Sequence, residues 1–302
     1  MRWAWVFLLG GVCFGQKVAV TFDDLPLNGG LPVGVSRAGI TRDVLGILKK
    51  RHVPAAYGFI NAAKLEGNAD GAEALKLWAA REPVGNHTYS HINLSESTVE
   101  QFQRNIVENE PALELLALSS NNKTHAGDWH WFRYPYLVEG DTVEKRRAVR
   151  EYLAKRGYKI AQITMDWEDY LWNSAYARCV DKKDAKAIEY LHTSYLSTAS
   201  TYIDYDRELA KLVYGHDISH VLLLHLGAYS STILPEVFDL LKKKGLKVVT
   251  LEEAESDPAY ASDPDLGLKD GGSLVDQMMV AKKIAFPEVT PKPYKELEAI
   301  CK

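Results

Sequence analysis

Short apolar runs alternate with segments of helical periodicity from residue 17 to residue 251, and this alternation limits the possible folds most strongly. In residues 36–52, for example, Ile40, Val44, Leu45 and Leu48 recur on one helical face. Such a strand–helix rhythm predicts a parallel sheet or barrel. The expected strands are 17–21, 55–60, one beginning at Val84, 131–136, 159–165, 221–225 and 246–251. The expected helices are 36–52, 72–81, 97–118 (opened by a capping box at 97–100), 142–156 and 234–244.

Length and composition are those of an ordinary globular protein. The chain has 302 residues, of which 46% are hydrophobic and 25% charged, and its formal net charge is −4. A mixed, slightly acidic balance gives no electrostatic footprint for nucleic acid. After the first residues the chain has no apolar run of about 18 residues, so we expect no membrane span.

The ends of the chain differ from its middle. Residues 1–15 combine Arg2, an apolar stretch and small residues, which predicts a signal peptide and a secreted or periplasmic protein; a buried first strand or helix is the alternative. Residues 16–256 are expected to form the catalytic domain and 257–302, rich in Pro, Asp and Gly, an irregular, partly ordered extension. After cleavage two cysteines remain, Cys179 and Cys301, which either pair in an oxidising compartment or stay as free buried thiols.

A longer helical stretch between Trp172 and Gly215 interrupts the strand–helix rhythm before the strand at 221–225. We expect it to pack on the barrel as an insertion. Its tyrosines are expected to pack between helices, with stacking on sugar rings as the alternative. These tyrosines are Tyr176, Tyr190, Tyr195, Tyr202 and Tyr205.

Polar side chains stand where the predicted strands end. Parallel strands of an α/β fold place their sites at their carboxyl ends, so these groups should project toward one cleft. In chain order they are Asp23 and Asp24, His87 and His91, Arg133 and Tyr136, Asp166 and Trp167, and His225. Each alone has a structural explanation, such as a turn, a surface ion pair or a satisfied core histidine; the ordered set predicts a site.

Two histidines four residues apart, together with one carboxylate, suit a divalent metal that keeps a position open for water. In this hypothesis Asp24, His87 and His91 bind the metal, while the adjacent Asp23 stays unbound and acts as a general base. This division of roles explains why two carboxylates stand side by side at a strand end. Zinc fits such a set best, and cobalt or nickel also suit it.

The segments "TFDD", "HTYSH", "RYPY", "DW" and "LLH" resemble, in order, the five motifs of the polysaccharide deacetylases, the NodB-homology proteins of carbohydrate esterase family 4. The resemblance covers about Val18 to Leu251 and implies a distorted (β/α) barrel of about seven parallel strands. It also implies that the protein removes N- or O-acetyl groups from sugars with a divalent metal.

Carried over motif by motif, the resemblance assigns a role to each of the remaining residues. Arg133 would hold the base Asp23, and the backbone N–H of Tyr136 would help to bind the oxyanion. His225 would act as the general acid, with Asp166 as its partner. Leu223 and Trp167 would shape the pocket. The segment "DW" lacks the Asp that usually precedes it in the family. This departure concerns the role assigned to Asp166 more than the roles of the metal ligands.

Three functions remain open from the sequence. The first is a hydrolase that deacetylates an acetylated glycan or oligosaccharide; the second applies the same chemistry to a small amide or ester. The third is an inactive carbohydrate-binding relative, against which the intact pair of Asp23 and His225 argues, because binding alone needs neither a base nor an acid.

Overall fold

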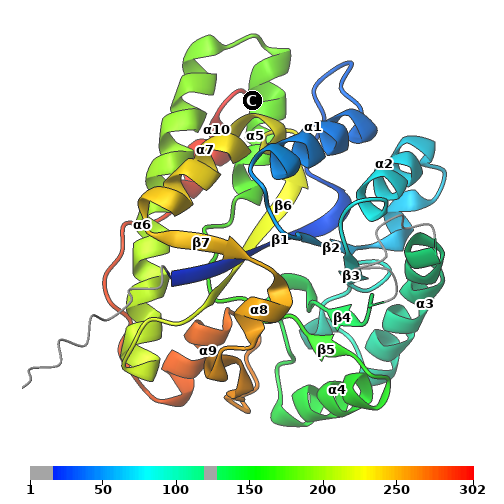
Figure 1. Ribbon diagram of the computed structural model, residues 1–302, viewed down its shortest axis with the longest axis vertical. Coiled ribbons are helices and arrows are strands. Elements are labelled where there is room, and N and C mark those ends of the chain that lie inside the picture. The colour runs from blue at the N-terminus through cyan, green and yellow to red at the C-terminus, as the bar shows by residue number, and fades with distance from the viewer. Residues whose placement is uncertain (1–15, 119–127) are drawn as a thin grey trace, which may run out of the picture.

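The computed structural model describes residues 16–118 and 128–302, and its centre is a sheet of parallel strands (Figure 1). The strands are β1 (Gln16–Asn28), β2 (Tyr57–Ile60), β3 (Val84–Asn86), β4 (Trp131–Phe132), β5 (Lys159–Ile160), β6 (His220–Gly227) and β7 (Leu246–Val249). They follow the order β5-β4-β3-β2-β1-β6, with β7 beside the first residues of β1. Every strand pairing is parallel, which confirms the expected architecture. The predicted signal peptide lies outside the described residues.

The sheet curves into a distorted barrel. Its two edges, β5 and β6, are joined by the chain that follows β5, since Met165 forms a parallel bridge with Leu222. The backbone N–H groups of Thr164 and Met165 both donate to the carbonyl of Val221, at 3.0 and 3.1 Å. A short connection thus takes the place of a full strand pair, and the carboxyl ends of β1, β3 and β6 face one opening.

Helices cover the outside of the barrel, as the periodicity predicts. They are α1 (Arg37–Lys50), α2 (Ala69–Ala79), α3 (Val99–Leu118), α4 (Val143–Lys155) and α7 (Ser230–Lys243). The predicted capping box of α3 is shifted by one residue: Thr98 Oγ1 accepts from Gln101 N, and Gln101 Oε1 accepts from Thr98 N. Reciprocal capping of this kind satisfies two backbone donors that the helix itself cannot.

Three expected strands end early. β4 stops at Phe132 because Pro135 lacks an N–H and Tyr136 and Leu137 have φ of 57°, so the chain turns into a short 3₁₀ helix (Pro135–Leu137). β5 stops at Ile160, after which the chain crosses to β6. β7 gives way to α8 (Leu251–Glu255), whose N-cap Thr250 accepts from Glu253 N.

The insertion consists of two helices, α5 (Tyr170–Asp181) and α6 (Ala185–Tyr214). Tyr195 lies in the core and contacts Tyr229, which also contacts Tyr176, so these side chains pack between helices as expected. Tyr202 and Tyr205 differ, because both line a cavity.

The segment after residue 257 has short helices separated by non-helical chain: η4 (Pro258–Ala261), α9 (Leu274–Ala281) and α10 (Tyr294–Ala299). Leu274 and Val275 of α9 share an apolar cluster with Leu209 and Val213 of α6. Near the end of the chain, Cys301 forms a disulfide with Cys179 of α5, with the two Cα atoms 5.2 Å apart. Of the two alternatives left open for these cysteines, the structure therefore has the paired one.

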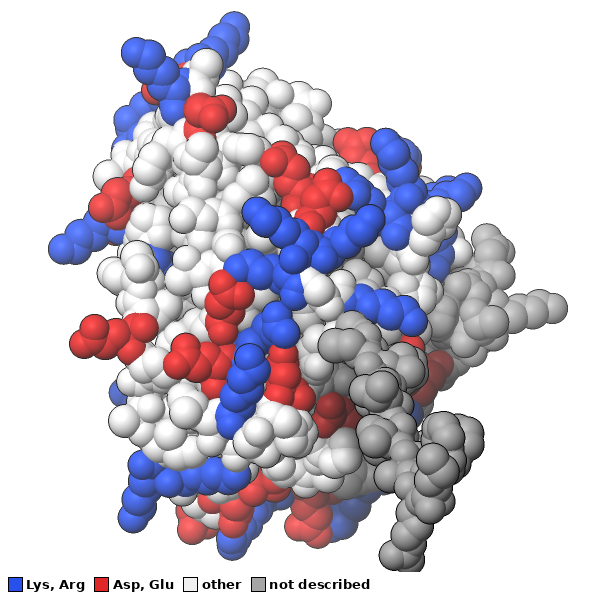
Figure 2. Space-filling view, turned by 60° about the vertical axis from the view of Figure 1, so that its left-hand side comes forward, with Lys and Arg blue, Asp and Glu red and all other residues white. Residues whose placement is uncertain are grey.

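The surface carries charges of both signs. On the face shown in Figure 2, Lys and Arg side chains are interspersed with Asp and Glu. Among the described helices, none is long and apolar enough to cross a bilayer.

Two further 3₁₀ turns, Ala62–Leu65 and Leu94–Glu96, follow β2 and β3.

Candidate active site

A cavity of about 670 Å³ opens at the carboxyl ends of the strands. It collects most of the side chains that the sequence singled out, although they come from distant parts of the chain. The predicted residues that line it are Asp23, Asp24, His87, His91, Tyr136, Asp166, Leu223 and His225. Topology explains this convergence, because parallel neighbours end at the same edge of the sheet.

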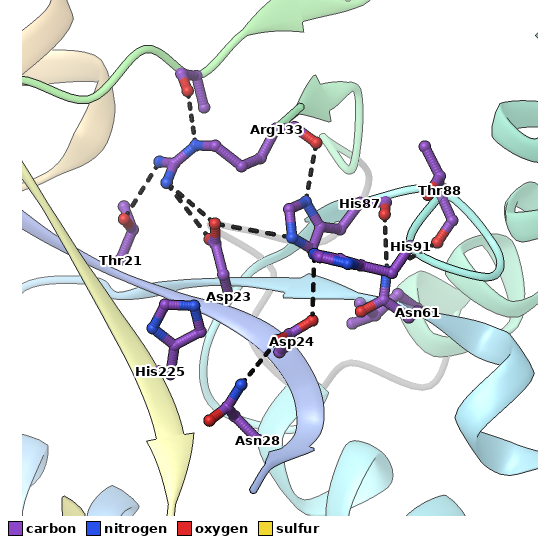
Figure 3. A network of polar contacts seen from close by, with 12 residues as sticks. Thr21, Asp23, Asp24, Asn28, Asn61, His87, Thr88, His91, Arg133 and His225 are labelled. Atoms are coloured by element: carbon purple, nitrogen blue, oxygen red, sulfur yellow. Dashed lines mark hydrogen bonds and ion pairs between the residues drawn. The ribbon is translucent and has the colours of Figure 1, made fainter. Parts of the chain in front are cut away.

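Asp24, His87 and His91 form the predicted metal-binding group. One donor atom from each lies within 4.8 Å of the others, and His91 Nε2 is 3.5 Å from Asp24 Oδ1 (Figure 3). His87 Nδ1 bonds the carbonyl oxygen of Arg133 at 2.8 Å, which leaves Nε2 turned toward the cavity. A second-nitrogen contact of this type orients metal-binding histidines in other proteins.

The protonation states of these three side chains suit the binding of a cation. Burial lowers the pKa of His87 and of His91, so both imidazoles are neutral, the form that binds metals. Burial alone would raise the pKa of Asp24, but the charge of Lys64, together with the neighbouring imidazoles of His87, His91 and His225, outweighs burial and holds this carboxyl well below its ordinary pKa. Asp24 Oδ1 is buried and accepts no well-aligned hydrogen bond within the described chain, although Lys64 Nζ lies 3.0 Å away. This oxygen is therefore available as a ligand.

Asp23 is held by Arg133, as predicted. Arg133 Nη1 lies 3.3 Å from both carboxylate oxygens, while Nε donates to the Ala161 carbonyl and Nη2 to Thr21 Oγ1. Both side chains are almost completely buried. Burial raises the pKa of Asp23 to about 6 even though Arg133 opposes the shift. The carboxylate is thus a stronger proton acceptor than an exposed aspartate.

The partner of His225 is Asp169, and the predicted pairing with Asp166 is wrong. Asp169 Oδ1 lies 2.7 Å from His225 Nδ1, and its Oδ2 accepts the backbone N–H of His225 at 2.9 Å. Asp166 instead accepts from the N–H of Glu168. The reason is a tight turn at Glu168, whose φ of 58° directs Asp169 back toward β6.

Burial and nearby carboxylates decide the protonation of His225. Burial disfavours the imidazolium, but the carboxylate of Asp169, together with those of Asp24 and Asp23, more than compensates and raises the pKa of His225 to about 9. At neutral pH His225 therefore carries a proton that it can donate. Asp166 stays apart from this pair, and burial raises its pKa to about 6.

Trp167 does not shape the cavity, contrary to the expectation. It is fully buried, lies outside the set of lining residues and contacts Tyr195 of α6 edge to face. Leu223 does line the cavity, and its side chain is the apolar surface beside the ionisable groups.

Backbone strain gathers at this cavity. Five of its non-glycine residues have φ between 57° and 67°: Asp24, His91, Tyr136, Leu137 and Glu168. A positive φ at a non-glycine residue costs free energy, and such residues cluster at functional sites. Among the described residues, no backbone acceptor is found for the N–H of Tyr136, so it is free to bind an oxyanion.

Sequence reasoning missed three residues of the site. Asp169 was within reach, because "DWED" offers three carboxylates beside the predicted strand end. Lys64 and Asn28, which contact the Asp24 carboxylate, gave no signal, since neither lies at the end of a predicted strand.

Comparisons with known proteins identify relatives of the chain. Residues 14–161 match the family model described as polysaccharide deacetylase. A chitin deacetylase of Arthroderma benhamiae is 23% identical over 242 residues, 80% of this chain and 52% of the relative, so the chain spans about half the relative's length. The structure of the chitin deacetylase from Colletotrichum lindemuthianum superposes with a TM-score of 0.52 at 22% identity, over 79% of this chain and 86% of that one, and shares the fold. Residues 14–161 of the chain thus belong to the polysaccharide deacetylase family, a family of hydrolases.

Proposed function

We propose that the protein is a metal-dependent hydrolase that removes acetyl groups from an N- or O-acetylated glycan or oligosaccharide. The observation that carries the proposal is the meeting, in one cavity, of a His₂Asp group, a buried base and a protonated histidine. Binding alone would need neither the base nor the acid, whereas hydrolysis of an amide or ester needs both.

The metal would be held by Asp24, His87 and His91. Two neutral imidazoles and one carboxylate suit zinc best, and cobalt or nickel also fit. A divalent ion in such a group supplies a lowered pKa for bound water and polarises an acyl oxygen.

The protein's own residues then divide the proton transfers. Asp23, held by Arg133, accepts a proton from the attacking water. His225, protonated through its pairing with Asp169, donates a proton to the departing amine or alcohol. The free N–H of Tyr136 is placed to bind negative charge on the acyl oxygen, a contact worth about 10²–10³-fold in other hydrolases.

The geometry of the site is compatible both with an acylated sugar and with another acylated molecule. Family membership and the two chitin deacetylases favour a sugar. The disulfide supports the proposal that the protein works outside the cytoplasm, secreted or in the periplasm, because such bonds persist in oxidising compartments.

The test is acetate release from acetylated chitooligosaccharides and from an aryl acetate, with zinc or cobalt and after chelation. We expect metal-dependent release from the oligosaccharides. Release from the aryl acetate alone would favour a non-sugar substrate, and release from neither with metal bound would refute the proposal.

Two variants separate the roles. Asp23→Asn should abolish turnover and His225→Ala should lower kcat, and both should retain the bound metal, measured by elemental analysis. Loss of metal from His225→Ala would instead identify His225 as a ligand.

A further inference from the structure

The loop that carries both histidines of the metal-binding group has a strained backbone. It spans residues 87–91 and follows β3, and Thr88 and His91 in it have φ of 63° and 57°. A positive φ at a non-glycine residue costs free energy and persists only where the surroundings impose it. Among the described residues, the last backbone bond from this loop to a neighbouring strand runs from His87 N to the carbonyl oxygen of Ile60. The rest of the loop must therefore be held by other groups.

The side chain of Asn61, directly after β2, bonds this loop twice. Its Nδ2 donates to the carbonyl oxygen of His87 at 2.6 Å and to that of Thr88 at 3.0 Å (Figure 3). The side chain is completely buried, and within the described chain its Oδ1 has no hydrogen-bond partner. A buried polar atom without a partner costs free energy. The two loop carbonyls that Nδ2 binds therefore explain why an amide stands at this position.

Asn86, the last residue of β3, binds the same segment. Its Oδ1 accepts the N–H of Thr88 at 2.9 Å, and its Nδ2 donates to the carbonyl oxygen of Ile106 at 3.0 Å. This side chain is completely buried as well. Asn61 and Asn86 together thus bond both the C=O and the N–H of the peptide group between His87 and Thr88.

Helix α3 supplies two more asparagines to this network. Asn105 accepts the N–H of Tyr89 with its main-chain oxygen and the N–H of Ser90 with Oδ1, both at 2.9 Å. Asn109 donates to the Oδ1 of Asn86 at 2.9 Å and so connects α3 to the loop. Fully bonded polar networks of this kind rigidify the segments that they join.

With its backbone bonded in this way, the loop determines where the two imidazoles lie. The rings of His87 and His91 contact each other edge to face, with their centroids 4.8 Å apart. The carbonyl oxygen of Arg133 holds His87 Nδ1, which directs Nε2 toward the cavity. The donor atoms of both histidines and of Asp24 consequently lie close enough to share one ion.

We propose that Asn61 and Asn86 are positioning residues of the metal-binding group, which hold the peptide group between His87 and Thr88 so that the imidazoles are in place before a metal binds. This inference rests on the proposed function, because it takes a divalent metal as the ligand of the group. A site that is ordered in advance loses less free energy to ordering when its ligand binds. Partners that orient metal ligands typically contribute about 10–100-fold to metal affinity.

The test measures the zinc affinity of Asn61→Leu by competition with a chromophoric chelator. Leucine is similar in size to asparagine and removes both bonds to the loop carbonyls. We expect zinc binding to weaken by about tenfold or more, because the imidazoles no longer keep one geometry. For the same reason the absorption spectrum of the cobalt-loaded variant should differ from that of the cobalt-loaded wild type.

Thr164→Val is the matched control, because Asn61→Leu also leaves buried carbonyls unpaired and so lowers stability. Thr164 is completely buried too, and its Oγ1 accepts the backbone N–H of Val221 at 3.0 Å, in the connection between β5 and β6. Valine has the same shape, so this variant also removes a buried bond to the backbone and lowers the free energy of unfolding. It should keep the zinc affinity and the cobalt spectrum of wild type. Equal weakening in both variants, or unchanged zinc binding in Asn61→Leu, would overturn the inference.

A measurement on wild type decides the matter if Asn61→Leu does not fold. The N–H groups of Thr88 and Tyr89 are both bonded to asparagines, so their hydrogen exchange reports on the loop. We expect similar protection in metal-stripped and zinc-loaded protein. Fast exchange that only zinc suppresses would show that the metal orders the loop, and would overturn the inference.

Neither readout needs turnover, so the inference and the proposed function can fail separately. If the two asparagine readouts come out as expected but no substrate yields acetate, the function fails and the inference stands. If acetate is released but Asn61→Leu binds zinc as wild type does, the inference fails and the function stands. If wild type binds neither zinc nor cobalt, both fail.

Discussion

Replacing Asp169 with Asn tests whether this residue, and not Asp166, sets the charge of His225. In the structure Asp169 contacts His225 twice, at 2.7 Å to Nδ1 and at 2.9 Å to the backbone N–H. Asn can keep one of these contacts but removes the negative charge. Burial, which lowers the pKa of an imidazole, is then opposed mainly by the charges of Asp24 and Asp23.

The magnitude follows from the pKa of His225, about 9 against an ordinary 6.5. At about 1.4 kcal/mol per pKa unit, the surroundings favour the imidazolium by about 3 kcal/mol. Asp169 is the largest favourable contribution, so its neutralisation should bring the pKa of His225 down by about two units.

The assay is the pH profile of kcat/KM. His225 works as an acid while it is protonated, so activity falls as the pH rises through its pKa. The alkaline limb should lie near pH 9 in wild type and about two units lower in Asp169→Asn. NMR titration of the imidazole in the same proteins gives a readout that does not depend on turnover.

Asp166→Asn is the matched control, three residues away, half-buried and also at the cavity. It should leave the alkaline limb in place, whatever its effect on KM. An unmoved limb in Asp169→Asn, or a limb that moves only in Asp166→Asn, would refute the reasoning and restore the pairing that the sequence suggested.

Three further outcomes follow from the structure. Lys64→Met should strengthen zinc binding about tenfold, measured against a chromophoric chelator, because unit charges 4 Å apart repel by about 1 kcal/mol even in water; unchanged or weaker binding would contradict this. Replacing Cys179 and Cys301 with Ala should lower the free energy of unfolding by about 2–5 kcal/mol in denaturant titrations, because their bond closes a long loop; equal stability would show that the bond is dispensable. Arg133→Met should move the acidic limb of kcat/KM upward, since Asp23 must lose its proton to act and Arg133 opposes the rise of its pKa; a limb at the wild-type pH would count against the pairing.

The sequence was sufficient for the parts of the site that sit on strand ends. Asp23 and Asp24 lie in β1 where its regular pairing with β2 and β6 is interrupted, and His87 follows β3, so the parallel sheet brings them to one edge. The hydrophobic periodicity of the sequence predicts the positions of such residues, because the direction of a strand determines where the side chains at its end lie.

Beyond the strand ends, periodicity no longer applies. β5 ends at Ile160, and the chain then crosses to β6 and turns at Glu168. Which of two nearby carboxylates reaches His225 depends on the dihedral angles of that turn, which the residue types alone do not set. For the same reason Trp167 was placed in the pocket although it packs against α6.

The part of the cavity that Asp206 and Asp276 line could not be predicted from the sequence, for a different reason. Asp206 and Asp276 are 70 positions apart and meet because α6 and α9 share an apolar cluster. Neither residue stands in a motif, and an acidic residue within a helix is ordinarily solvated. Only the packing of the two helices shows that these carboxylates face a common cavity.

The turn at residues 166–169 lies beside the cavity. Asp166 lines the cavity, and Asp169 holds the proposed acid. Between them, the carboxylate of Glu168 accepts from Lys292 and Tyr294 of the C-terminal segment, at 2.9 and 3.0 Å. Because Glu168 links Asp166 to Asp169, its contacts with Lys292 and Tyr294 also restrain the turn that positions Asp169. The proposed protonation of the leaving group therefore depends on one short segment, which is fastened by residues far outside the matched range 14–161.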